Sequence, residues 1–157
     1  MISKAIGERL EPQFLPVVQD DAEGLVELRI AAMRESLERI GRFSPERARD
    51  RFLSGFSPEN TQHICVDGQR IGFVVVKPDG EGLLLDHLYV RPDWQGLGIG
   101  SFVLKAIFEQ ADLLGKPIRV GALKGSDSNR FYARHGFNLI EEAEWDNYYV
   151  RLPRAAI

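Results

Sequence analysis

The most informative segment of the sequence is VRPDWQGLGIGSFVLKAIFEQ, residues 90–110. Gly96, Gly98 and Gly100 alternate there between an apolar run and residues with the apolar spacing of a helix. Glycine inside regular structure costs about 0.5–1 kcal/mol relative to alanine, so three of them need a reason. Backbone N–H groups at the start of a helix point outward and, together with the helix dipole, bind anions such as phosphate. The segment therefore predicts a phosphate-binding loop that leads into a helix over 99–114.

Composition and charge exclude several classes of protein. The 157 residues suffice for one domain with its own core, which we place at 1–157. The net charge of −3 favours neither nucleic acid nor an anionic membrane as a partner. No apolar run reaches the roughly 18 residues of a transmembrane helix, and residues 1–16 lack the apolar core of a secretory signal. A single cysteine, Cys65, excludes an intrachain disulfide, and three scattered histidines give no metal-ligand spacing. We therefore expect a cytoplasmic protein without a metal site.

Hydrophobic periodicity and turn residues predict one α+β domain of seven strands and four helices. The turn sequences Asp67-Gly68 and Pro78-Asp79-Gly80 separate runs of β-branched and aromatic residues, which predicts three successive antiparallel strands. Helices are predicted over 21–40, 44–55, 99–114 and 126–136, and strands over 13–19, 61–66, 69–77, 82–90, 117–123 and, as a final pair, within 137–152.

The glycine segment is compatible with more than one kind of loop. A dinucleotide-binding fingerprint needs G-x-G-x-x-G after a parallel strand, but residue 101 is serine and the preceding strands are predicted to be antiparallel. A Walker loop needs G-x-x-x-x-G-K-[ST], which is absent. A tight turn that only permits close packing is the structural alternative.

Two motifs carry a resemblance to a known family. Gln95 to Gly100 matches the pattern [QR]-x-x-G-x-[GA], and FYARHGF, residues 131–137, matches F-Y-x-x-x-G-F about thirty residues later. With the order of elements along nearly the whole chain, these motifs resemble the GNAT superfamily of N-acetyltransferases. The resemblance implies a mixed, mostly antiparallel sheet of six to seven strands flanked by about four helices. It also implies acetyl-coenzyme A as co-substrate, with no metal.

By the same resemblance, the coenzyme binds between the strands over 82–90 and 117–123. The backbone of Leu88, Tyr89 and Val90 would pair with the pantetheine arm, and one N–H there would polarise the thioester carbonyl. The pyrophosphate cradle would consist of Gln95, Gly96, Gly98, Ile99, Gly100 and Ser101.

The helix over 126–136 carries the residue that resembles the family's catalytic tyrosine. Tyr132 would protonate the departing thiolate, and its structural alternative is a core aromatic residue. The family often has asparagine seven residues earlier, where this chain has Gly125. Asn129 shares the helix face of Tyr132 and is the candidate to replace it in binding the pantetheine.

A base must remove a proton before an ammonium group can attack. Asp86 interrupts the apolar strand LLLDHLYV, where a buried carboxylate is costly unless it is paired or functional. His87 has a suitable intrinsic pKa for a proton shuttle, but strand alternation aims it away from Asp86 unless a β-bulge intervenes.

The acceptor site is the least determined part. The helix over 21–40 is expected to turn Val26, Ile30, Met33 and Leu37 toward the core, with Arg29 and Ser36 at the edge of that face and Glu35 in solvent. Arg29 in the cleft would favour an amine that carries a carboxylate.

These inferences predict an N-acetyltransferase that moves an acetyl group from acetyl-coenzyme A to a primary amine by direct attack in a ternary complex. The acceptor is predicted to be a small molecule, with an amino-acid-like amine as one option. A non-catalytic acyl-coenzyme A sensor on the same fold is the alternative. Homodimers are frequent in the family and remain open here.

Overall fold

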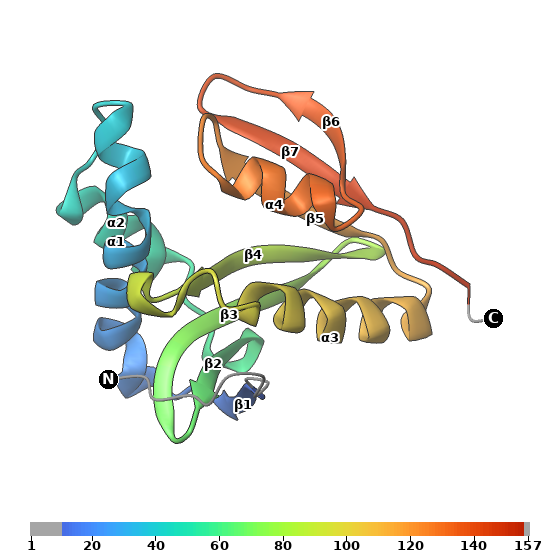
Figure 1. Cartoon of the computed structure of the whole chain (residues 1–157), viewed down its shortest axis with the longest axis horizontal. Coiled ribbons are helices and arrows are strands. Elements are labelled where there is room, and N and C mark those ends of the chain that lie inside the picture. The colour runs from blue at the N-terminus through green and yellow to red at the C-terminus, as the bar shows by residue number, and fades with distance from the viewer. Residues whose placement is uncertain (1–10, 156–157) are drawn as a thin grey trace.

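The order of helices and strands follows the prediction from sequence. A computed structural model describes residues 11–155 and contains the predicted elements in the predicted order (Figure 1). The strands are β1 (Gln13–Pro16), β2 (Thr61–Val66), β3 (Gln69–Asp79), β4 (Gly82–Val90), β5 (Ile118–Leu123), β6 (Asn138–Glu142) and β7 (Asp146–Arg151). The helices are α1 (Ala22–Arg39), α2 (Pro45–Ser54), α3 (Ile99–Leu114) and α4 (Ser128–Arg134). Among these helices, none combines the length and the apolar character needed to cross a membrane.

The seven strands form one mixed sheet in the order β1-β2-β3-β4-β5-β7-β6. Every neighbouring pair is antiparallel except β4 and β5, which are parallel. The connection between these two strands passes through α3, as a parallel pair requires. The predicted α+β class is confirmed, and the parallel pair lies at the centre of the sheet.

Helices cover both faces of the sheet and divide the core into two clusters. On one face, Phe73 and Val75 of β3 pack with Phe52 of α2 and with the start of α1. On the other face, Leu85 of β4 packs against α3 and α4. Figure 1 shows α1 and α2 together at the left of the view, apart from α3 and α4.

Helix α1 differs from its predicted burial. Its buried residues are Ala22, Leu25, Val26 and Arg29, all in its N-terminal half. Met33 and Leu37, predicted for the core, are only partly buried, because their side of α1 lines a cavity. Arg29, predicted for the edge of the apolar face, is instead only 9% exposed.

An ion pair attaches the last strand to α3. Arg151 on β7 is buried and donates hydrogen bonds to both carboxylate oxygens of Asp112, at 2.8 and 3.1 Å. Its guanidinium also lies 4.0 Å from the ring centroid of Phe108. The Arg151 side chain and then the backbone N–H of Arg154 lower the pKa of Asp112 to about 2. The pair therefore stabilises the folded chain at neutral pH.

Candidate functional site

The two parallel strands separate after three residue pairs. Leu83, Leu84 and Leu85 of β4 pair with β5, and from Asp86 to Val90 this edge of β4 has no partner strand in residues 11–155. A cavity of about 1090 Å³ opens there, between α1 and α2 on one side and β5, α4 and β7 on the other. Its volume is slightly above the range of about 300–1,000 Å³ that is usual for small-molecule sites. An extended ligand can therefore pair with the exposed backbone of β4.

The glycine loop forms one wall of this cavity. Gly96 and Gly98 have positive φ values of 75° and 83°, a left-handed conformation that is costly for other residues. Gly98 is the N-cap of α3, and the first N–H in the helix with a backbone partner belongs to Phe102. The N–H groups of residues 99–101 are thus free to bind an anion at the positive end of the helix. An ideal Cβ placed on Gly96 or Gly98 meets no atom within 4 Å, so the space beside the loop is open.

Gly100 has a different role from the other two glycines. Its φ is not positive, and a Cβ placed on it would lie 2.9 Å from Cζ of Phe131 on α4. Gly100 therefore also permits close packing of α3 against α4, a second reason for glycine that the sequence interpretation did not include. Gln95 also acts within the loop, since its Nε2 donates to the carbonyl of Val90 at 2.9 Å.

A serine and a histidine meet beside the first turn of α3. Oγ of Ser101 lies 2.9 Å from Nε2 of His135, whose Nδ1 lies 2.7 Å from the carbonyl oxygen of Phe131. A carbonyl only accepts, so Nδ1 carries a proton, and in the neutral imidazole Nε2 then accepts from the serine hydroxyl. His135 therefore fixes the orientation of the hydroxyl at the anion-binding loop.

Tyr132 reaches the cavity from α4. It is 6% exposed and packs among the rings of Phe131, Phe137 and Tyr149. Among residues 11–155 its hydroxyl has no hydrogen-bond partner and is not fully enclosed, so it is open to the cavity. Burial, with a smaller contribution from the charge of Tyr89, raises the pKa of Tyr132. The hydroxyl is consequently a proton-bearing donor throughout the neutral range.

A β-bulge in β4 decides where Asp86 and His87 point. The β3–β4 register passes from Val75 opposite His87 to Val76 opposite Leu85, so Asp86 is the extra residue. Regular alternation would place the two side chains on opposite faces. With the bulge, Nε2 of His87 lies 3.7 Å from Oδ2 of Asp86, and the His87 ring packs against Phe52 of α2. The sequence interpretation required a β-bulge for His87 to lie beside Asp86, and the structure contains that bulge.

Polar contacts continue from Asp86 in both directions. Nζ of Lys77 lies 3.1 Å from Oδ2 of Asp86 and donates to the carbonyl of Gly55 at 2.9 Å. On the other side, Nδ1 of His87 lies 3.3 Å from the hydroxyl of Tyr89, which accepts from Nε of Arg29 at 3.3 Å. The tyrosine proton is thereby directed at Nδ1, and Nε2–H of His87 faces Asp86.

Burial lowers the pKa of His87 to about 4, and the charges of Arg29, Lys77 and Arg51 oppose its protonation further. The negative charge of Asp86 acts in the opposite direction and is outweighed. His87 is therefore neutral at pH 7 and a weak base.

Comparison with known proteins agrees with this geometry. The family model described as "Acetyltransferase (GNAT) domain" matches residues 59–139, which is more than half of the chain. The chain belongs to the GNAT acetyltransferase family. It is accordingly an acetyl-CoA-dependent N-acetyltransferase. No curated protein matches the chain by sequence comparison.

Several solved structures share the fold at low sequence identity. PaiA N-acetyltransferase from Thermoplasma acidophilum, in complex with coenzyme A, superposes with a TM-score of 0.74 at 18% identity, covering 91% of this chain and 99% of that one. An acetyltransferase from Thermus thermophilus superposes with a TM-score of 0.71 at 19% identity, covering 91% of this chain and 97% of that one. The ribosomal-protein-S18-alanine N-acetyltransferase from Escherichia coli superposes with a TM-score of 0.69 at 14% identity, covering 93% of this chain and 97% of that one. At these identities the likeness shows the GNAT fold alone.

The structure of this GNAT domain brings nearly all the candidate residues to one cavity. The lining includes Arg29, Ser36, Asp86, His87, Leu88, Tyr89, Val90, Gln95, Gly96, Gly98, Ile99, Gly100, Ser101 and Tyr132. Asn129 is not part of the lining. Its amide donates to the carbonyls of Leu123 and Ser126 and accepts from Tyr149 and Asn147, which supports a structural role.

Some residues that line the GNAT cavity were not predicted from the sequence. Glu35, expected in solvent away from the cleft, is exposed but lines the cavity. Arg47 and Arg51 of α2 also line it. Their spacing of four on a predicted helix was visible in the sequence, but the face of α2 that meets the cavity was not.

Proposed function

We propose that this GNAT enzyme transfers the acetyl group of acetyl-CoA directly to the primary amine of a small molecule, with both substrates bound in the one cavity. The observation that carries the proposal is the junction of three features on that cavity. An anion-binding helix start, an unpaired edge of β4 and an open tyrosine hydroxyl all line it. Together they suit the diphosphate, the pantetheine arm and the sulfur of a thioester.

The residues present fit acetyl-CoA, which supplies the activated acetyl group. The N–H groups at the start of α3 hold the diphosphate, with the Ser101 hydroxyl beside them. The backbone of Leu88, Tyr89 and Val90 binds the pantetheine arm as an added strand and polarises the thioester carbonyl. Tyr132 donates a hydrogen bond to the sulfur as it leaves, which its protonated hydroxyl is suited to do.

Asp86 is the proposed base on the other side of β4. Its carboxylate is partly exposed, and Lys77 occupies only part of its accepting capacity. His87 and Tyr89 hold the neighbouring hydrogen bonds in one arrangement, so His87 positions the carboxylate and does not itself take the proton. The amine nitrogen that has lost its proton attacks the thioester carbon, and the sulfur departs with the electron pair.

An amine-panel assay tests the proposal. Purified protein is mixed with acetyl-CoA and each amine, free thiol is followed by absorbance, and the acetylated product is identified by mass spectrometry. We expect amine-dependent thiol release and a product heavier by one acetyl group. Saturable coenzyme A binding without turnover of any amine would contradict the transfer and favour an acyl-CoA sensor.

We further propose that residues 1–157 act as one transferase domain in the cytoplasm. The sheet supports the first point, because it joins β1 near one end of the described residues to β7 near the other. Residues 1–10 and 156–157 lie outside the described part. The single cysteine, Cys65, is buried in β2, which is consistent with a reducing compartment.

A further inference from the structure

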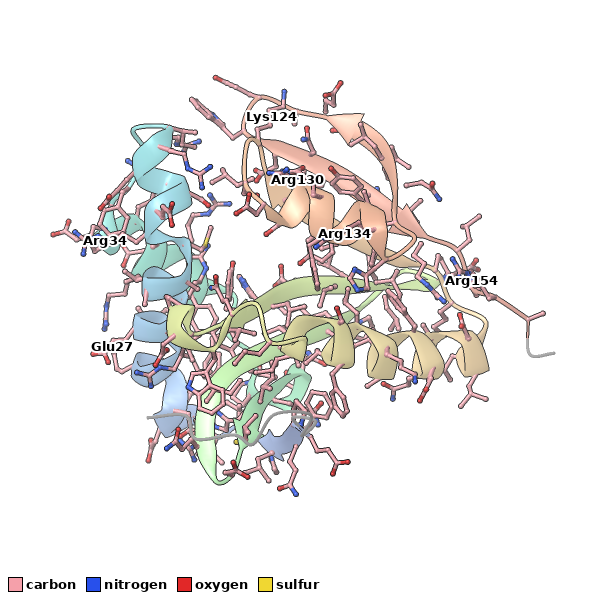
Figure 2. All side chains as sticks on the ribbon, viewed as in Figure 1. Glu27, Arg34, Lys124, Arg130, Arg134 and Arg154 are labelled. Atoms are coloured by element: carbon pink, nitrogen blue, oxygen red, sulfur yellow. The ribbon has the colours of Figure 1, made fainter. Side chains whose placement is uncertain are left out.

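All but one of the arginines in the described part of the chain fall into two groups, and the exception is Arg154. Within residues 11–155, those that form ion pairs all lie outside the cavity, and they are Arg34, Arg49, Arg70, Arg91, Arg130 and Arg151. Those that line the cavity have no carboxylate within ion-pair distance in the same part of the chain, and they are Arg29, Arg39, Arg42, Arg47, Arg51, Arg119 and Arg134. Figure 2 shows Arg34, a member of the first group, on the outer side of α1. Seven arginines against five carboxylates leave the lining net positive, although the whole chain has a net charge of −3.

Arg29 is the member of this group whose environment most requires a counter-charge. It is 9% exposed, and its partners are neutral: the carbonyl of Ala48 at 3.0 Å and the hydroxyl of Tyr89 at 3.3 Å. The nearby carboxylate of Asp86 is held by Lys77 at 3.1 Å. A buried cation without an anion is unfavourable, and the guanidinium has five N–H donors, of which these contacts use two. Arg29 lines the cavity, so an anionic ligand group can supply the missing charge.

Helix α2 extends this positive region. Ser44, Arg47, Ala48 and Arg51 follow the spacing of one helix face, and all four line the cavity. Arg49 lies on another face and is paired with Glu23. The charge of Arg51 reaches the side chains of His87 and Tyr89, which places it near the same end of β4 as Arg29. Arg29, Arg47 and Arg51 are called the arginine triad below.

The arginine triad lies on the opposite side of β4 from the coenzyme loop. Tyr89, the partner of Arg29, packs in the core cluster between the sheet and α1–α2. Leu88 and Val90, the residues on either side of it, pack in the cluster that includes Ile99 at the start of α3. The phosphates bound at α3 therefore lie on one side of the strand, and the arginine triad is available to the second substrate.

We propose that the arginine triad binds an oxyanion of the acceptor, so that the acceptor is an amine that also carries a carboxylate or a phosphoryl group. The inference rests on the proposed transfer to an amine and adds the chemical class of that amine. Planar guanidinium groups bind both kinds of oxyanion through paired hydrogen bonds.

Matched pairs of acceptors test the inference. An α-amino acid is compared with its carboxamide, and phosphoethanolamine with ethanolamine, by the ratio of kcat/KM within each pair. We expect a ratio of about 10 to 100 in favour of the anion in at least one pair, and the pair that shows it distinguishes carboxylate from phosphoryl. Arg47→Gln and Arg51→Gln are each expected to lower that ratio about tenfold. Arg49→Gln removes the same charge from the outer surface of α2 and is expected to leave it unchanged.

Three results would overturn the inference. The first is a kcat/KM ratio of one or less in both pairs of acceptors, and the second is a peptide without acidic groups that is a better acceptor than either anion. The third is a loss of activity in the Arg47→Gln and Arg51→Gln variants that is due to a higher KM for acetyl-CoA. If no amine is acetylated, the proposed function fails, and thermal unfolding with succinate or inorganic phosphate decides the inference separately. A stabilisation present in the wild type and Arg49→Gln but absent from the Arg47→Gln/Arg51→Gln double variant supports the anion site. No stabilisation, or equal stabilisation in all three, contradicts it.

Discussion

Replacing Tyr132 by phenylalanine removes one hydroxyl from the cavity and little else. The ring stays among Phe131, Phe137 and Tyr149, and the hydroxyl has no partner to lose within the described residues. We therefore expect the free energy of unfolding to change by less than about 0.5 kcal/mol, since no buried group is left unpaired. A change in turnover can then be assigned to chemistry.

The raised pKa of Tyr132 sets the size of the expected effect. A thiol ordinarily has a pKa of about 8.5 and tyrosine about 10, so complete proton transfer from the hydroxyl to a thiolate is uphill by more than about 2 kcal/mol. The contribution is then that of a hydrogen bond to a charged acceptor, about 1.5–3 kcal/mol. This corresponds to a fall in kcat of about 10- to 150-fold for Tyr132→Phe.

The assay is single-turnover acetyl transfer under saturating substrates, followed between pH 6 and 10. The wild type is expected to show no loss of rate from deprotonation of Tyr132 in this range, because its pKa lies above 10. An unchanged kcat with chemistry limiting would exclude Tyr132 from the reaction. A fall well beyond a thousandfold would contradict the hydrogen-bond argument and indicate complete proton transfer.

Four substitutions and a pH series test other parts of the site and the fold. Asp86→Asn keeps the shape but cannot accept a proton, so kcat/KM at pH 7 is expected to fall about 10²- to 10⁴-fold, and an unchanged value would exclude the base role. Gly98→Ala forces a left-handed alanine at a cost of about 1–2 kcal/mol and is expected to raise the KM for acetyl-CoA at least severalfold. Gly24→Ala, in the first turn of α1 where a Cβ would meet no atom within 4 Å, is expected instead to stabilise the protein by about 0.5 kcal/mol. The free energy of unfolding, measured with denaturant, is expected to fall from pH 6.5 to 4, where His87 is protonated only in the unfolded chain. It is expected to fall again from pH 4 to 2 as Asp112 loses its charge, and Asp112→Asn should remove part of this second fall. A free energy of unfolding that does not change with pH would refute both assignments.

Local chemistry explains why the elements could be predicted. The dipeptide Asp67-Gly68 stands between β2 and β3, where both residues adopt positive φ, and Ser44 caps α2 by accepting from the N–H of Arg47. Such signals depend on a few neighbouring residues, so one sequence contains them. The predicted strand over 82–90 and helix over 99–114 match β4 and α3 residue for residue.

The features that could not be predicted depend on contacts between distant segments. The burial of Arg29 is set by Ala48 and Tyr89, which lie 19 and 60 residues away. At position 100, a side chain would collide with the ring of Phe131 on another helix. Neither partner can be identified from periodicity, because periodicity gives the face of an element and not what covers that face.

The bulge at Asp86 links the fold to the chemistry. Pairing of β4 with β5 ends at Leu85, and the extra residue of β4 follows immediately. The same residue therefore begins the free strand edge, which can bind an extended ligand, and reverses the alternation that would have turned Asp86 away from His87. In a regular strand the backbone edge would still be free, but the Asp86 carboxylate and the His87 imidazole would lie on opposite faces of β4. In the proposed reaction, the coenzyme and the acceptor would therefore meet at this added residue of β4, one from each side of the strand.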